Sequence, residues 1–129
     1  NNLDMFQEMD TAAKLHKVFR RDPTVMDART VLQMATIGGA RVLNLADRIG
    51  SVEAGKDADI ILVDTRKPHL TPLYNCYSQL VYAAGGADVS TVIINGKIVL
   101  KDRRFPGLDV EGILDRARKV ARKIGEKGG

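Results

Sequence analysis

The sequence predicts an α/β chain in which two helices come first, a small set of strands follows, and a longer helix comes last. Three observations carry this prediction. Apolar residues recur at three- and four-residue steps over residues 4–19, 28–43 and 110–124, as they do along one face of a helix. A β-branched apolar run fills residues 59–64. Within residues 90–101, two short β-branched apolar runs flank an Asn-Gly pair, which is the pattern of a hairpin.

The first helix is expected over residues 4–19, and its apolar face includes His16. Asn2 or Asp4 can cap its start, because a side-chain oxygen there accepts from free backbone N–H groups. Pro23 prevents the helix from continuing much beyond Arg20. On such a face, His16 is expected to pack as a core residue rather than to bind a metal.

The second helix is expected over residues 28–43, with Asp27 as its N-cap. Gly38 and Gly39 fall inside it, and each costs roughly 1 kcal/mol relative to alanine. Close approach of another backbone is the usual compensation for such glycines. The alternative is that Gly38 breaks this element into two shorter helices.

The middle of the chain changes to strand patterns. Residues 50–55 are expected to be extended, and 59–64 to form a buried strand. A loop with two prolines follows, and then a short helix over residues 74–84 that Gly85 and Gly86 stop.

The hairpin over residues 90–101 is the clearest local prediction. Asn-Gly suits the two positive-φ positions of a type I′ turn. A two-residue turn pairs Ile93 with Ile98 and Val92 with Val99, which places apolar pairs on both faces of the ribbon. Something is therefore expected to cover the hairpin on both sides.

The last helix is expected over residues 110–124, with Asp109 as its cap. Its final turns carry basic residues, which suit the negative end of the helix dipole. No aromatic residue is interleaved to stack on bases, so nucleic-acid binding is not expected. The basic residues are Arg116, Arg118, Lys119, Arg122, Lys123 and Lys127.

Composition bounds the class of protein. The chain has 129 residues, 44% of them hydrophobic, and a net charge of +4, which suits one domain or two small pieces rather than a disordered chain. No apolar run approaches the ~20 residues of a membrane helix, and the N-terminus has no secretory pattern, so a cytoplasmic location is expected. The single cysteine, Cys76, agrees with a reducing compartment. Because Asn1 is not preceded by a methionine, a piece of a longer protein is expected.

The residues alone do not build an active site. The chain has no G-x-S-x-G string, and residues 50–56 lack the Ser or Thr that a phosphate-binding loop needs. His16, His69 and Cys76 do not have the spacing of a metal site. We interpret Cys76 as structural, because no base partner is evident.

Four strings resemble the amidohydrolase superfamily. GSVEAGKDADIILVD at 50–64 resembles its G-x-[IV]-x-x-G-x-x-A-D-[IL]-[VI] pattern, and TIGGARVLN at 36–44 and VIINGKIVL at 92–100 resemble the helix and hairpin around it. The opening NNLDMFQEM at 1–9 is similar to the segment after the last metal-ligand aspartate in one branch of the family. That branch deaminates 5-methylthioadenosine and S-adenosylhomocysteine.

The resemblance implies the C-terminal part of a (β/α)₈ metal-dependent hydrolase. Residues 1–45 would be the terminal helices of the barrel, and 46–108 part of a composite β-sandwich that contains the hairpin. Residues 109–129 would be a C-terminal amphipathic helix. The rest of the full-length enzyme is then the first expected partner.

The resemblance also implies hydrolytic deamination of an adenosine-like nucleoside, with a divalent metal, zinc as the expected ion, in the full-length enzyme. The family's metal ligands all lie outside this sequence, so the chain alone is expected to bind no cofactor and to be inactive. The alternatives are an aminohydrolase for guanine, cytosine or triazines, and a non-catalytic oligomerisation module.

By the same resemblance, Asn1 and Asn2 are the residues nearest the expected active site, where helix capping is their expected role. Five residues of the shared strings are expected to be structural. Unpaired sheet edges lead us to expect that the chain self-associates. The five are Gly50, Gly55, Asp59, Asn95 and Gly96.

Overall fold

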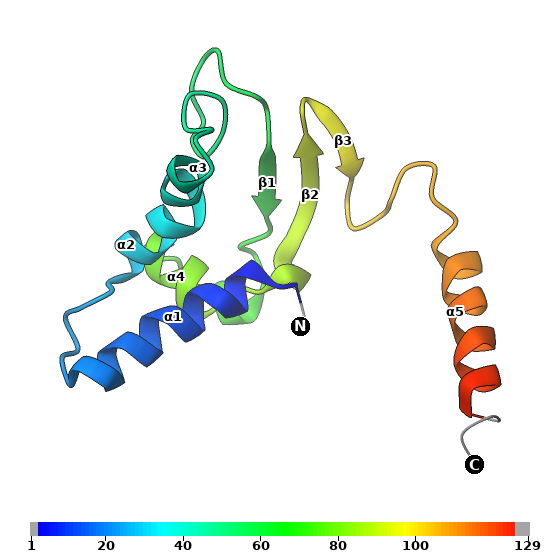
Figure 1. Cartoon of the computed structure of the whole chain (residues 1–129), viewed down its shortest axis with the longest axis horizontal. Helices are drawn as coiled ribbons and strands as arrows, with labels where there is room; N and C mark the ends of the chain where they lie inside the picture. The colour runs from blue at the N-terminus through cyan, green and yellow to red at the C-terminus, as the bar shows by residue number, and fades with distance from the viewer. Residues whose placement is uncertain (1–2, 126–129) are drawn as a thin grey trace.

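The computed structural model describes residues 3–125. Four helices gather on one side of a three-stranded antiparallel sheet, and a fifth helix stands apart beyond the opposite edge (Figure 1). The strands are β1 (Ile60–Val63), β2 (Val89–Ile94) and β3 (Lys97–Leu100), in that spatial order. The gathered helices are α1 (Met5–Arg20), α2 (Ala28–Gln33), α3 (Gly39–Val42) and α4 (Cys76–Tyr82), and the separate one is α5 (Val110–Gly125).

Helix α1 confirms the first prediction. The Asp4 carboxylate caps it by accepting a hydrogen bond from the Phe6 N–H at 2.9 Å. The helix ends at Arg21, which adopts the left-handed conformation at φ 53°, so the chain turns before it reaches the proline. Asn2, the other candidate cap, lies outside the described residues.

The second predicted helix is continuous from residue 28 to 42, but it widens in the middle. A π-helical turn, Met34–Gly38, joins α2 to α3, and Gly38 itself keeps helical angles. The alternative of a break at Gly38 is therefore wrong. A Cβ on Gly38 would lie 2.9 Å from the Gln33 carbonyl oxygen, so the widened turn requires a residue without a side chain there. Asp27 caps the start by accepting from the Arg29 and Thr30 N–H groups.

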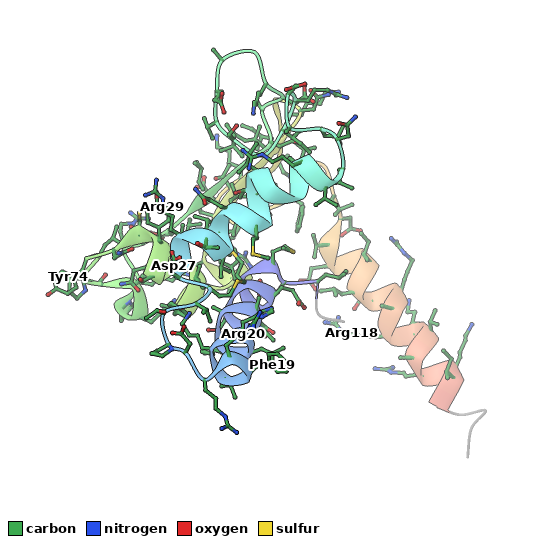
Figure 2. All side chains as sticks on the ribbon, turned by 60° about the vertical axis from the view of Figure 1, so that its left-hand side comes forward. Phe19, Arg20, Asp27, Arg29, Tyr74 and Arg118 are labelled. Carbon is green, nitrogen blue, oxygen red and sulfur yellow. The ribbon has the colours of Figure 1, made fainter. Side chains whose placement is uncertain are left out.

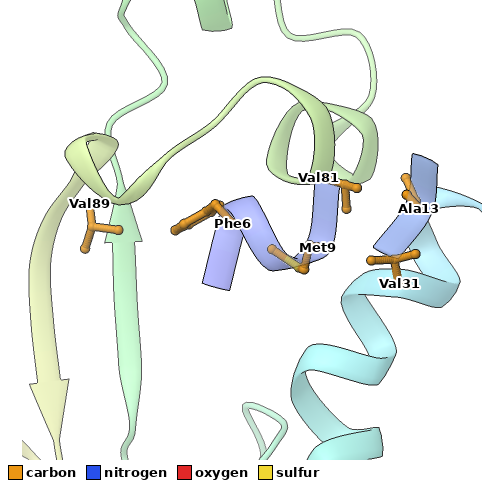
Figure 3. Packing of buried hydrophobic residues seen from close by; sticks show 7 residues of the cluster. Phe6, Met9, Ala13, Val31, Val81 and Val89 are labelled. Atoms are coloured by element: carbon orange, nitrogen blue, oxygen red, sulfur yellow. The ribbon is translucent and has the colours of Figure 1, made fainter. Parts of the chain in front are cut away.

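The hydrophobic core lies where α1, α2 and α4 meet the start of β2 (Figure 3). Helix α4 contacts both α1 and α2 around the core side chains. Alanine and valine make up most of the core's buried side chains, and Phe6 and Met9 fill the space between them. The buried members are Phe6, Met9, Ala13, Ala28, Val31, Val81 and Val89.

The prediction that His16 packs in the core is wrong, because this residue is exposed. The buried side chains of α1 all precede Lys14, and the second half of the helix is exposed except at Lys17, which is half-buried against the loop that follows. Phe19 is 78% exposed at the outer end of α1 (Figure 2). Periodicity identifies an apolar face, but it does not say whether a neighbour covers that face.

The hairpin turn forms as predicted, but one cross-strand pair is different. Asn95 and Gly96 have φ angles of 48° and 74°, and Ile93 lies opposite Ile98. Val92 lies opposite Leu100 rather than Val99, because the register shifts between Val92 and Ile93. Val99 is the extra residue of this β-bulge, so the predicted Val92–Val99 pair is wrong.

The expected covers of the hairpin are only partly present among the described residues. Val89 and Leu100 are buried, whereas Ile94 is 53% and Ile98 49% exposed. On β1, Ile61 and Leu62 are also about half exposed. The start of β2 thus packs into the helical core, and apolar surface remains open elsewhere on this small sheet.

Residues 50–55 form bends and turns, so the predicted extended segment is wrong. The strand predicted over 59–64 forms as β1, but none of its residues is buried, so the predicted burial is wrong.

Helix α4 is shorter than expected, because the Asn75 side chain caps it by accepting from the Ser78 N–H at 3.1 Å. Helix α5 has the predicted extent, and Asp109 accepts from the Gly112 N–H at 3.0 Å. No residue of α5 is buried. Among residues 3–125, no helix is long and apolar enough to cross a bilayer.

Candidate functional site

The predicted residues nearest the chemistry, Asn1 and Asn2, lie outside the described residues. The described chain enters α1 through Leu3, whose φ is 55°, and Asp4. Besides capping α1, the Asp4 carboxylate accepts a second hydrogen bond from the Gly86 N–H at 3.1 Å. The start of α1 is thereby joined to a segment more than eighty residues away, at the entry to β2.

That segment is a 3₁₀ turn, Gly86–Asp88, built around a buried carboxylate. The Asp88 side chain is 5% exposed and accepts from the Lys67 ammonium at 2.7 Å. It lies 3.1 Å from Nε2 of His69 and accepts from the Gly85 N–H at 2.9 Å. We call Lys67, His69, Gly85 and Asp88 the Asp88 cluster.

The electrostatics of the cluster favour the ionised carboxylate. Burial by itself raises the pKa of Asp88, but the hydrogen bonds from Lys67, His69 and Gly85, with the charge of Lys67, outweigh burial. The net effect is a pKa well below the usual range of an aspartate. Both carboxylate oxygens are engaged by these donors, so Asp88 is a structural anion and is not free to bind a metal or take a proton from a substrate.

Charged side chains from other elements also hold the backbone of this turn. The Lys67 ammonium donates to the Ala87 carbonyl at 2.8 Å. The Arg103 guanidinium, from the segment after β3, donates to the carbonyls of Gly86 and Val89, each at 3.1 Å. The turn is therefore tied at once to the start of α1, to the segment after β1 and to the segment after β3.

The five residues expected to be structural lie in the loop between α3 and β1, just before β1, and in the hairpin turn. Gly50 packs against the second helix, where a Cβ would lie 2.7 Å from the Ala40 Cβ and 2.9 Å from the Ile37 Cα. The close approach of another backbone expected at Gly38 and Gly39 is absent from the described part of the chain, because Cβ atoms added there would meet only Gln33 and Met34 of the same helix. Gly50 approaches the helix at Ile37 and Ala40 instead. Gly55 lies in a turn with open space around it.

The other three of these residues join the hairpin to the start of β1. The Asp59 carboxylate accepts from the Asn95 N–H at 2.7 Å, and the Gly96 N–H donates to the Ala58 carbonyl at 3.0 Å. The Asp59 side chain thus fixes the hairpin turn against the neighbouring strand.

Sequence reasoning missed Lys56, which holds the loop between α3 and β1 together. Its side chain is 12% exposed, and the ammonium donates to the Ala46 carbonyl and the Ser51 hydroxyl, each at 2.6 Å. It also missed Asp88. In both cases some partners lie ten or more residues away, the Ala46 carbonyl for Lys56 and the Lys67 and His69 side chains for Asp88, and such distances leave no spacing signal in the sequence.

The described residues do not fit a catalytic metal. Residues 3–125 contain no group of three or more His, Cys, Asp or Glu side chains that could hold an ion. Cys76 is an exposed free thiol at the first position of α4. His69 makes its Nε2 contact with Asp88, and His16 is exposed on α1. We therefore derive no metal-dependent step from this chain.

Two curated proteins similar to this chain are named as deaminases. The chain is 54% identical over 126 residues to a 5-methylthioadenosine/S-adenosylhomocysteine deaminase of Syntrophus aciditrophicus, covering 98% of this chain and 28% of the relative. It is 48% identical to a 5'-deoxyadenosine deaminase of Methanosarcina mazei, over 96% of this chain and 28% of that one. The chain thus spans little more than a quarter of the length of the curated relatives it matches.

Two solved structures are also similar to this chain. A zinc-bound adenosine deaminase from Xanthomonas campestris superposes with a TM-score of 0.89 at 43% identity, covering 95% of this chain and 28% of that one. An atrazine chlorohydrolase from Arthrobacter aurescens shares the fold, with a TM-score of 0.78 at 24% identity, over 88% of this chain and 25% of that one. The model of the amidohydrolase family matches residues 1–99. The chain belongs to the amidohydrolase family.

Proposed function

We propose that this chain is the C-terminal part of a metal-dependent enzyme that deaminates an adenosine-like nucleoside of the 5-methylthioadenosine/S-adenosylhomocysteine class. The observation that carries the proposal is the 54% identity to a deaminase of that name over 98% of the chain. The zinc bound to the Xanthomonas adenosine deaminase supports zinc as the metal. We call the proposed full-length protein the whole enzyme.

In this proposal the chain supplies structure rather than reacting groups. Its described residues hold no metal cluster, so residues elsewhere in the whole enzyme would bind the ion. An apolar hollow of about 240 Å³ opens between α1 and α2, with Met5, Met9, Val31 and Met34 in its wall. This is the surface on which further parts of a (β/α)₈ barrel would pack.

Substrate class is tested in the whole enzyme by ammonia release from a panel of nucleosides and bases. We expect 5-methylthioadenosine, S-adenosylhomocysteine and 5'-deoxyadenosine to react at least about 100-fold faster than guanine or cytosine, judged by kcat/KM. Faster turnover of guanine, cytosine or a chlorotriazine would contradict this substrate class and support the alternative aminohydrolase. The coding sequence upstream of Asn1 is a further check, because H-x-H and G-T-D strings there are required by the proposal.

We further propose that the chain, separated from the whole enzyme, self-associates. Large apolar side chains stay exposed on both the helices and the sheet, including Phe19, Val42, Ile94 and Ile98. The outer strands β1 and β3 also have free edges in the described sheet. Size-exclusion chromatography with light scattering should give a mass above that of a monomer, and a stable monomer at about 50 μM would contradict this expectation.

A further inference from the structure

We propose that Asp4 is a positioning residue of the whole enzyme, whose carboxylate fastens the entry to α1 onto the Gly86–Asp88 turn. The inference rests on the proposed function for its activity readout. One carboxylate oxygen accepts from the Phe6 N–H at 2.9 Å, and the other accepts from the Gly86 N–H at 3.1 Å. The same side chain therefore caps a helix and joins two distant parts of the chain.

The turn that Asp4 reaches is held firmly enough to serve as an anchor. The buried Asp88 carboxylate accepts from the Gly85 N–H, next to the bond from Asp4. The Arg103 guanidinium donates to the Gly86 carbonyl at 3.1 Å, on the other side of the same residue. A segment tied by ionised groups on both sides resists displacement more than an ordinary exposed turn does.

The backbone just before Asp4 needs such an anchor. Leu3 has φ 55°, a left-handed conformation that costs free energy for a residue with a side chain, and it is fully exposed. Its own side chain therefore makes no packing contacts that would favour this bend. The hydrogen bonds that Asp4 accepts, one residue later, fix the direction from which the chain enters α1.

The position of this bend gives it a consequence for catalysis. In a (β/α)₈ barrel the loop entering each helix comes from the C-terminal end of a strand, and the active site lies at that end. The start of α1 is such a point in the proposed enzyme. Small displacements of groups near a reaction centre lower kcat strongly, because reacting atoms tolerate little misplacement.

The test compares two aspartate caps of the same kind in the whole enzyme. Asp4→Ser keeps one oxygen for the Phe6 N–H but cannot also reach Gly86. Asp27→Ser is the matched control, because Asp27 caps α2 by accepting from the Arg29 and Thr30 N–H groups without a bond to a distant segment. We expect Asp4→Ser to lower kcat about tenfold with little change in KM, and Asp27→Ser to keep kcat within about twofold of the parent.

Hydrogen exchange gives a readout that does not depend on activity. Asp4→Ser should raise amide exchange both at residues 3–8 and at residues 85–89, whereas Asp27→Ser should raise it only near the start of α2. Equal kcat in the two variants, or unchanged exchange at residues 85–89 in Asp4→Ser, would overturn the inference. If the parent enzyme deaminates none of the nucleosides, the proposed function fails, and the exchange comparison still decides the role of Asp4 as an anchor.

Discussion

Replacing Asp88 by alanine is expected to lower the free energy of unfolding of the whole enzyme by about 2–4 kcal/mol. The buried carboxylate accepts from Lys67, His69 and the Gly85 N–H, so its removal leaves the Gly85 N–H without an acceptor and Lys67 without its counter-charge. Because the Lys67 and His69 side chains are 37% and 50% exposed, water can replace part of what they lose. The loss is measured by urea denaturation.

A matched control is the exposed ion pair on α5. Asp115 and Arg118 lie 2.6 Å apart, with side chains 62% and 58% exposed, and such a pair contributes less than about 1 kcal/mol. Asp115→Ala should therefore change stability far less than Asp88→Ala. Equal losses in the two variants would show that the Asp88 cluster is not a stabilising feature of the fold.

The same cluster predicts a dependence on pH. The pKa of Asp88 is lowered in the folded protein, so its stabilisation is fully present above its ordinary unfolded pKa of about 3.9. This stabilisation is lost as pH falls from about 4 toward the lower folded pKa. The Tm of the parent should therefore drop more steeply between pH 4 and pH 2 than that of Asp88→Asn, and parallel curves would contradict the assignment.

Replacing Gly50 by alanine is expected to cost about 2–4 kcal/mol of stability. Gly50 has φ 91°, and its added Cβ would lie 2.7 Å from the Ala40 Cβ and 2.9 Å from the Ile37 Cα. Both atoms belong to the continuous second helix, so neither can move without displacing backbone.

Gly55 provides the control for Gly50. It has nearly the same φ, 92°, but nothing lies within 4 Å of an added Cβ. Gly55→Ala should therefore carry only the conformational cost of about 1 kcal/mol. The difference between the two variants in urea denaturation measures the clash with the helix, and equal costs would show that the loop moves away freely.

Local features of this fold were predictable from the sequence because their causes are local. Asp4, Asp27 and Asp109 cap helices through N–H groups two or three residues away. The Asn95-Gly96 turn follows from the φ angles that this pair allows. The family resemblance also rests on short strings such as residues 50–64, and the family match over residues 1–99 confirms it.

Features that depend on distant segments were not predictable in this way. The Asp88 cluster joins Lys67, His69 and Asp88 across some twenty residues, and no spacing rule connects them. His16 shares the apolar period of α1, yet no described neighbour covers it. The predicted Val92–Val99 pair is wrong because the bulge at Val99 is a property of the strand pair and not of the turn.

The most direct test of the central claim is a segment exchange with the Syntrophus aciditrophicus deaminase. The 126 residues of this chain that align with that enzyme at 54% identity replace its corresponding segment. We predict that the chimera binds zinc and releases ammonia from 5-methylthioadenosine, and that the chain alone does neither. A chain that binds zinc and deaminates by itself, or a folded chimera that cannot bind zinc, would contradict the account.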